Sequence, residues 1–271
     1  MTNQDPLVSV LFITYKRYDL LEQSLRRFRE NTDYPNLEIV IADDGSGPEI
    51  QRKIRALAAD VFALSPKNRG MGANNNNGLR HCTGKYILMI QDDWLCHGPS
   101  DYLSNAIAML EANPQVGIIN FAGAHHPPDL TQPLLGSSEP CFVTPTPAAS
   151  AKEEFLYSDQ PHLQSRGALE FMGEYYEDRS IGRAEIDYSQ RWERQYSFLT
   201  AVFPNYYMRV FSNEGEDPAL SFRQQELRYR VDQALMPIAN FLRENCRPLF
   251  RVGKASVRST VALIEKLRTP R

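Results

Sequence analysis

Two adjacent carboxylates, Asp92 and Asp93, follow an apolar run from Tyr86 to Ile90. Two neighbouring acids repel each other, and a bound divalent cation relieves that repulsion. Hard oxygen ligands suit Mg2+ or Mn2+, which also bind diphosphates. The pair alone is more typical of a solvated turn, because Asp is common where strands end. The residue types therefore predict either a cation site for a phosphate-bearing ligand or an ordinary turn.

Polar residues also follow two other apolar runs. Thr14 and Tyr15 end the run that begins at Leu7, and Asp43 and Asp44 end the run that begins at Leu37. In open α/β sheets, ligands bind outside the carboxyl ends of the strands. Three polar clusters expected at one edge favour a binding site over a turn.

The segments that would position these clusters alternate between two kinds of pattern. Apolar, β-rich runs predict strands at 7–14, 37–42, 61–64, 86–90 and 116–121. Apolar residues at helical spacing predict helices at 18–30, 48–59 and 102–111. Residues 68–78, rich in Gly and Asn, are expected to form a loop that leads into a helix near Leu79. This alternation predicts a parallel α/β sheet.

The alternation stops after Phe121. Residues 122–164 contain seven prolines and are expected to be a long loop, a kind of segment that is usually functional or mobile. Beyond it we expect helices at 167–176 and 184–195, a strand at 197–203 and a helix at 219–245.

Composition narrows the function class. The chain has 271 residues, 42% of them hydrophobic, and a net charge of -3, which gives no overall attraction to nucleic acid. Its four cysteines form no CxxC pair, so neither a zinc site nor a disulfide framework is expected. We see no signal-peptide pattern and no apolar run of about 20 residues. These features favour a cytoplasmic location.

The C-terminal segment differs in charge from the rest of the chain. Residues 238–271 hold eight Lys or Arg against Glu244 and Glu265, a net charge of +6 that leaves -9 elsewhere. Apolar residues are interleaved with these cations. Such a segment is typical either of a helix on an anionic membrane surface or of a helix packed on the protein with a solvated basic face. Both interpretations stay open. A helix on the membrane surface would also place the protein peripherally on the inner face of the membrane.

Taken together, the motifs resemble the family 2 glycosyltransferases, whose fold is called GT-A. The resemblance covers about residues 7–121 and, less closely, 185–191. The matching segments keep the family's order and spacing: Val8-Ser9-Val10 to Thr14-Tyr15, Ile41-Ala42-Asp43-Asp44-Gly45-Ser46, Asn68-Arg69-Gly70, Asn76-Asn77-Gly78, Gly84-Lys85-Tyr86-Ile87 and Gln91-Asp92-Asp93-Trp94.

The resemblance implies a role for each matching residue. Thr14 and Asp44 would hold the nucleobase, Asp92 would contact the ribose or sugar, and Asp93 would bind the Mn2+ or Mg2+ that bridges the diphosphate. The remaining residues implied to bind the donor are Tyr15, Asp43, Asn68, Arg69 and Asn76.

The resemblance also implies a general base in the segment 184–191. Glu185 precedes Arg191 by six residues, as the base does in the family, and Asp187 is the nearest competitor. The chain departs from the family in three places. Gln91 stands where an Asp is common, Ala184 where an acid often precedes the base, and Asn75 where an Arg is common. The first and third departures reduce the charge available to a cation and to phosphate.

We therefore predict a GT-A domain over residues 1–215, with a nucleotide-sugar half at 7–121 and an acceptor half at 122–215. A helical, basic extension would occupy 216–271. The resemblance implies an inverting transferase that moves a sugar from a nucleotide diphosphate sugar, most simply a UDP-sugar, to an acceptor hydroxyl. A bacterial surface polysaccharide, a lipid-linked glycan or a small molecule would be the acceptor. The alternatives are a nucleotidyltransferase and a non-catalytic nucleotide-sugar-binding module.

Overall fold

The computed structural model describes residues 5–121, 132–133, 142–144, 157–177, 183–195, 197–202 and 210–213. The chain divides into two units, residues 1–215 and 216–271. The predicted basic extension, the helix expected at 219–245 and most of the segment 122–156 lie outside the described residues. Among the described helices, none is long and apolar enough to cross a membrane.

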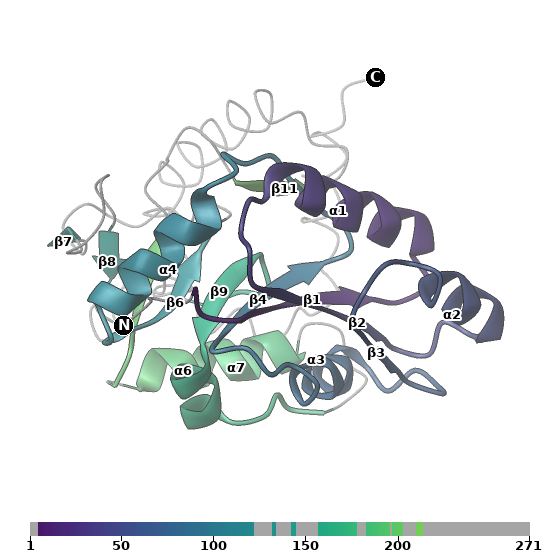
Figure 1. Cartoon of the computed structure of the whole chain (residues 1–271). Helices are drawn as coiled ribbons and strands as arrows, with labels where there is room; N and C mark the ends of the chain where they lie inside the picture. The colour runs from purple at the N-terminus through teal and green to yellow at the C-terminus, as the bar shows by residue number, and fades with distance from the viewer. Residues whose placement is uncertain are drawn as a thin grey trace, which may run out of the picture. The chain divides into compact units, whose positions relative to one another are not determined.

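A mixed α/β arrangement positions the polar clusters (Figure 1). The strands are β1 Val8–Thr14, β2 Leu37–Asp43, β3 Val61–Leu64, β4 Tyr86–Gln91, β5 Trp94–Cys96, β6 Val116–Asn120, β7 Gln132–Pro133, β8 Phe142–Thr144, β9 His162–Ser165, β10 Leu199–Val202 and β11 Phe211–Asn213. The helices are α1 Tyr18–Asn31, α2 Pro48–Ile54, α3 Met71–Leu79, α4 Tyr102–Ala112, α6 Arg166–Met172 and α7 Arg183–Arg194.

The main sheet has the strand order β3-β2-β1-β4-β9-β6-β10-β8-β7, and β5 pairs separately with β11. The strands β3, β2, β1 and β4 are parallel, as the sequence predicts. Thr14 pairs with Asp43, and Ile13 pairs with Gln91. The polar residues that follow β1, β2 and β4 therefore meet at one edge of the sheet, which confirms the expected convergence.

The strand β9 adds an antiparallel member to the predicted parallel sheet, and it corrects the prediction of a loop that extends to residue 164. It lies between β4 and β6 and runs antiparallel to both. Its polar residues His162 and Gln164 are fully buried, so no apolar run marks the strand in the sequence. The Gln164 amide donates to the Tyr188 hydroxyl at 2.9 Å, a partner that only the tertiary fold supplies.

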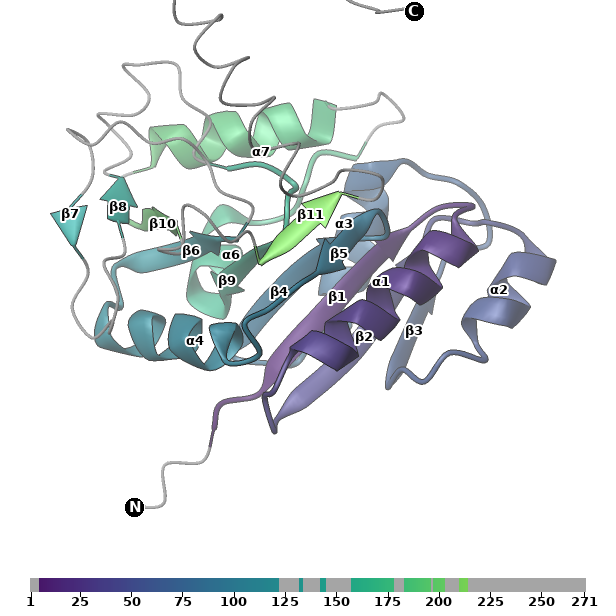
Figure 2. The ribbon, with the colours of Figure 1, turned by 90° about the horizontal axis from the view of Figure 1, so that it is seen from above.

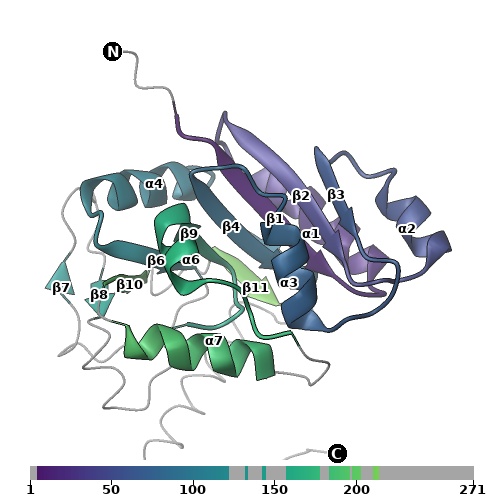
Figure 3. The ribbon, with the colours of Figure 1, turned by 90° about the horizontal axis from the view of Figure 1, so that it is seen from below.

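Helices cover both faces of the sheet, and the alternation of side chains along β1 explains why. Val10 and Phe12 pack on the face covered by α1, α2 and α4, whereas Leu11 and Ile13 pack on the face covered by α3, α6 and α7. Figure 2 shows α1 and α4 over the first face, and Figure 3 shows α3, α6 and α7 over the second. Strands buried on both faces read as continuous apolar runs.

The helix α3 corrects a second expectation, because the Gly- and Asn-rich segment is largely helical from Met71 onward. Asn74, Asn75 and Asn76 are buried. Three asparagines of the helix donate to distant backbone carbonyls: Asn74, Asn76 and Asn77. Asn74 donates to the carbonyls of Thr14 and Ala42, at 3.2 Å each. A Cβ added to Gly78 would lie 2.5 Å from Leu11 Cδ1, so this glycine lets α3 lie close against the sheet. Asn and Gly have low intrinsic helix propensity, which disfavours a helix here. The tertiary contacts of these residues outweigh that low propensity.

Candidate active site

The first acid of the strand-end pair is tied to the neighbouring strand. Asp92 is 4% exposed and its Oδ2 accepts a hydrogen bond from Thr14 Oγ1 at 2.7 Å. Burial raises the pKa of Asp92, while the Thr14 hydroxyl and the nearby Arg17 guanidinium act in the opposite direction. Two residues that the sequence assigns to donor binding, Thr14 and Asp92, are thus in direct contact.

A cation that sequence reasoning missed contacts both acids of the pair. Arg17 Nη1 lies 3.2 Å from Asp92 Oδ1 and 3.1 Å from Asp93 Oδ2. Asp93 Oδ1 is buried and has no hydrogen-bond partner in the described part of the chain. The only signal in the sequence is an arginine directly after Thr14-Tyr15-Lys16.

The two acids at the end of β2, Asp43 and Asp44, form hydrogen bonds with different segments. Asp43 shapes its own turn, because it accepts from the Ser46 backbone N–H at 2.9 Å and from Gln51 Nε2 at 2.7 Å. Asp44 holds the next loop, because its two oxygens accept from the backbone N–H groups of Arg69 and Gly70 at 2.7 and 2.9 Å. Burial raises the pKa of Asp44, and these two N–H groups oppose that shift.

The other residues expected at the donor side lie around this edge. Asn68 packs its backbone against Gly45, where an added Cβ would lie 2.6 Å from Asn68 N. Arg69 Nη2 pairs with Glu177 Oε2 at 2.5 Å, and Tyr15 is 37% exposed. Asn76 is buried and exchanges hydrogen bonds with the backbone of Tyr175, at 2.9 and 2.8 Å. The Asn76 contacts tie α3 to the segment before α7.

The two candidate bases have different surroundings on α7. Glu185 Oε1 accepts from the backbone N–H of Asp159 at 2.9 Å. Asp187 Oδ2 instead pairs with Arg191 Nε at 2.9 Å, one helical turn along a half-exposed surface. Glu185 therefore faces the segment that leads into β9, and Asp187 faces away along its own helix.

Asp159 is a second residue that sequence reasoning missed. Its Oδ1 accepts from the Tyr157 hydroxyl at 2.7 Å, and its side chain is 7% exposed. Burial raises the pKa of Asp159 to about 7, and the nearby charge of Glu185 raises it further, while hydrogen bonds from Tyr157 and Asn75 act against this shift. Strongly shifted acids in a polar cluster are typical of functional sites. The sequence did not indicate this role, because Asp159 stands alone in a segment predicted to be a loop.

The two acidic regions lie at the same edge of the sheet. The start of β9 is opposite the end of β4, because His162 pairs with Met89. Asp159 lies just before His162, and Glu185 is bonded to Asp159, so both lie beyond the edge where Asp92 and Asp93 follow β4. The fold therefore brings an acid pair and a candidate base to one side of the sheet.

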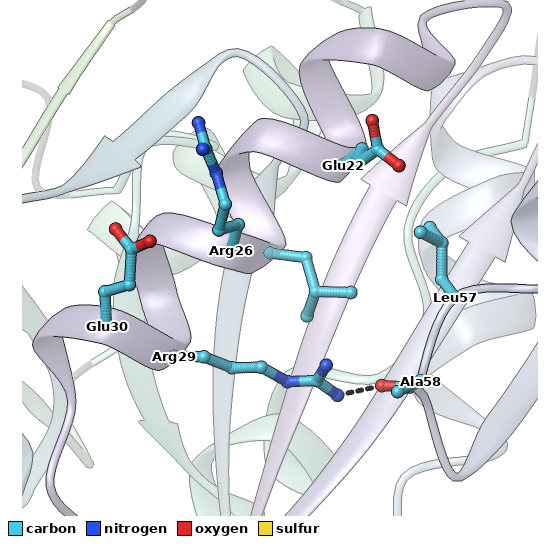
Figure 4. A pocket seen from close by; sticks show the side chains of 7 residues that line it. Glu22, Arg26, Arg29, Glu30, Leu57 and Ala58 are labelled. Carbon is cyan, nitrogen blue, oxygen red and sulfur yellow. Dashed lines mark hydrogen bonds between the residues drawn. The ribbon is translucent and has the colours of Figure 1, made fainter.

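A separate hollow of about 330 Å3 lies beside α1, toward the segment that follows α2. Figure 4 shows Arg29 donating to the Ala58 carbonyl in this hollow, with Glu22, Arg26 and Leu57 around it. It holds none of the residues that the sequence assigned to donor binding or catalysis. We therefore do not assign it to the reaction.

Comparison with known proteins agrees with this geometry. The sequence model of the family described as glycosyl transferase family 2 matches residues 9–135. A glucosyltransferase of Campylobacter jejuni, the GalNAc(5)-diNAcBac-PP-undecaprenol beta-1,3-glucosyltransferase, is 28% identical over 123 residues, 44% of this chain and 38% of its own length. Human beta-1,4 N-acetylgalactosaminyltransferase 1 is 31% identical over 115 residues, 41% of this chain and 20% of its own. The chain thus spans less than half the length of these relatives.

Solved structures show the same fold. A mannosyltransferase of Pyrobaculum calidifontis, in complex with GDP-Man and Mn2+, has a TM-score of 0.53 and 20% identity, over 75% of this chain and 56% of its own. S. aureus TarS, in complex with UDP-GlcNAc, has a TM-score of 0.52 and 18% identity, over 79% of this chain and 60% of its own. Residues 9–135 therefore match the sequence model of glycosyl transferase family 2, and the chain has the GT-A fold.

Proposed function

We propose that the chain transfers a sugar from a nucleotide diphosphate sugar to an acceptor hydroxyl, with inversion at the anomeric carbon. The observation that carries this proposal is the placement of the Asp92-Asp93 pair and Glu185 beyond one edge of the sheet. The family of residues 9–135 supports it. The name of the Campylobacter relative, which acts on an undecaprenol-linked glycan, supports a role in bacterial surface glycan or glycoconjugate synthesis.

The nucleotide would lie over β1 and β2, with a uridine base read by Asp44. Each carboxylate oxygen has two lone pairs, so Asp44 can accept a ring N–H while it holds Arg69 and Gly70. Asp92, held by Thr14, would accept from a ribose or sugar hydroxyl. The UDP-GlcNAc complex of TarS supports a UDP-sugar, although the Pyrobaculum structure holds a GDP-sugar, so a nucleotide panel is needed.

The acid pair fits a divalent cation such as Mn2+ or Mg2+. Asp93 Oδ1 is a buried oxygen with no partner among the described residues, and a hard cation binds such an oxygen well. Within the described residues, no group of three or more His, Cys, Asp or Glu side chains gathers. Asp93 would therefore hold the ion together with oxygens of the diphosphate. A bound divalent ion supplies Lewis-acid stabilisation of the leaving diphosphate.

Glu185 would act as the general base. The acceptor hydroxyl would give its proton to a Glu185 carboxylate oxygen as the hydroxyl oxygen bonds to the anomeric carbon. The bond from that carbon to the diphosphate breaks on the opposite face, which inverts the configuration. The hydrogen bond from Asp159 N–H to Glu185 Oε1 would orient the carboxylate and leave Oε2 to accept the proton.

The replacement Glu185→Gln tests this assignment. A general base contributes about 10^2 to 10^4-fold, so turnover should fall by about that factor while nucleotide binding stays nearly unchanged. Asp187→Asn is the matched control, because Asp187 pairs with Arg191 on the same helix, and it should keep near wild-type turnover. The reverse result would move the base to Asp187.

The product distinguishes this reaction from the alternatives. Thermal-shift screening with Mn2+ and a panel of nucleotide sugars would identify the donor. Phosphorus NMR would then identify the product, with water as the acceptor until a sugar acceptor is known. Release of a nucleoside diphosphate supports glycosyl transfer. Release of pyrophosphate would indicate a nucleotidyltransferase, and tight binding without any product would indicate a binding module.

A further inference from the structure

The cation that contacts the acid pair is placed by an unusual backbone turn. Lys16, between β1 and α1, has a φ of +59°, in the left-handed region that residues other than glycine rarely adopt. Its backbone N–H donates to Ser46 Oγ at 2.6 Å, which anchors the turn to the end of β2. Arg17 follows directly and reaches Asp92 and Asp93 beyond the end of β4. Strained residues of this kind often serve a functional arrangement.

One nitrogen of Arg17 contacts an oxygen of each acid, next to the oxygen that a cation would bind. Nη1 contacts Asp92 Oδ1 and Asp93 Oδ2, while Thr14 already occupies Asp92 Oδ2. Asp93 Oδ1 is then the carboxylate oxygen of the pair without a recorded partner in the described part of the chain. Arg17 contacts one oxygen of each acid, so its positive charge offsets the negative charge of the pair.

We propose that Arg17 is an internal counter-ion, which a divalent cation displaces from the acid pair and which then binds the diphosphate of the donor. This proposal rests on the proposed function for its second step only. The first step needs only Asp92, Asp93 and Arg17. In this role Arg17 stays paired with both acids until a cation and a nucleotide bind together.

Charge and exposure both favour such an exchange. The Arg17 side chain is 53% exposed, whereas that of Asp92 is 5% exposed, so Arg17 can move away while the acids stay in place. A guanidinium and a divalent cation repel each other strongly when both lie within a few ångströms of the same carboxylates. A guanidinium also matches the paired oxygens of a phosphate, so a bound diphosphate offers Arg17 a new partner at the same edge.

Calorimetric titration of Mn2+ into the full chain, without nucleotide, tests the first step. Arg17→Gln removes the competing charge and should bind Mn2+ at least about tenfold more tightly than wild type, because one cation no longer has to leave. Lys16→Gln is the matched control. It removes a neighbouring positive charge whose Nζ lies over the Tyr15 ring, and it should change the Mn2+ affinity by less than about threefold.

A conservative variant separates displacement from a general structural effect. Arg17→Lys keeps a cation beside the acid pair and should bind Mn2+ within about threefold of wild type. Circular dichroism and thermal unfolding would show that each variant is folded. Equal or weaker Mn2+ binding by folded Arg17→Gln, including no binding at all, overturns the proposal. A gain of the same size in Lys16→Gln would also overturn it, because the effect would then be one of general charge.

Titration of UDP at saturating Mn2+ tests the second step. Arg17→Gln should bind UDP about tenfold more weakly than wild type, because the diphosphate loses a charged partner. An unchanged UDP affinity would refute the transfer of Arg17 to the diphosphate. If wild type binds neither UDP nor GDP with Mn2+, the proposed function is wrong, and the titration with Mn2+ alone still decides whether Arg17 competes for the acid pair.

Discussion

Replacing Asp159 with asparagine is expected to change how the stability of the protein depends on pH. Asp159 is buried against Tyr157, and its pKa is raised from 3.8 to about 7, chiefly by burial. The folded state therefore keeps the Asp159 proton over a pH range in which the unfolded chain has already released it. Because the folded state binds more protons there, stability falls as pH rises from about 4 to about 7.

The size of this effect follows from the pKa. Each pKa unit corresponds to about 1.4 kcal/mol, so ionising Asp159 in the folded state costs roughly 4 kcal/mol in total. About 2–3 kcal/mol of this loss falls between pH 5 and pH 8. The other groups around Asp159 are Glu185 and the tyrosines 157, 175 and 188. Burial raises the pKa of each of these tyrosines, so they stay neutral in this interval.

Urea unfolding at pH 5 and pH 8 would measure the effect. Asp159→Asn has no proton to lose and can still accept from the Tyr157 hydroxyl. The free energy of unfolding of Asp159→Asn, taken relative to that of wild type, should therefore be about 2–3 kcal/mol higher at pH 8 than at pH 5. Asp187→Asn, which removes a half-exposed acid from α7, should show nearly the same difference from wild type at both pH values. An Asp159→Asn difference that does not change with pH would refute the argument.

Three further outcomes are expected. Asp44→Ala should weaken UDP binding about tenfold with or without Mn2+. Asp43→Ala should mainly lower the unfolding temperature, because Asp43 holds its own turn. Calorimetry that shows the opposite pattern would reverse these roles. Gly78→Ala should lower stability by about 1–3 kcal/mol in thermal unfolding, because the new Cβ would lie 2.5 Å from a leucine methyl of β1. Gly167→Ala is the control and should not lower stability, because a Cβ there meets nothing within 4 Å. Removing residues 241–271, which carry most of the basic segment, should reduce co-sedimentation with anionic liposomes, and equal binding by the full and shortened chains would show that this segment is not the anchor.

Local patterns in the sequence determined the parallel half of the sheet and the place of the donor-side acids. The strands β1, β2 and β4 read as continuous apolar runs because both of their faces are buried. Each run ends in polar residues, and parallel strands put those ends at one edge. For the same reason Thr14 and Asp92, 78 positions apart, could be expected to lie close together, and they are in contact.

Tertiary structure alone decided the elements whose partners are distant and polar. The strand β9 is buried through Gln164 and His162, and α3 is helical despite its asparagines and glycines, because contacts with remote residues satisfy their polar groups. Arg17 and Asp159 escaped prediction for a related reason. The fold supplies Asp92 and Asp93 as the partners of Arg17, and it supplies the burial that raises the pKa of Asp159. No local sequence pattern encodes those neighbours.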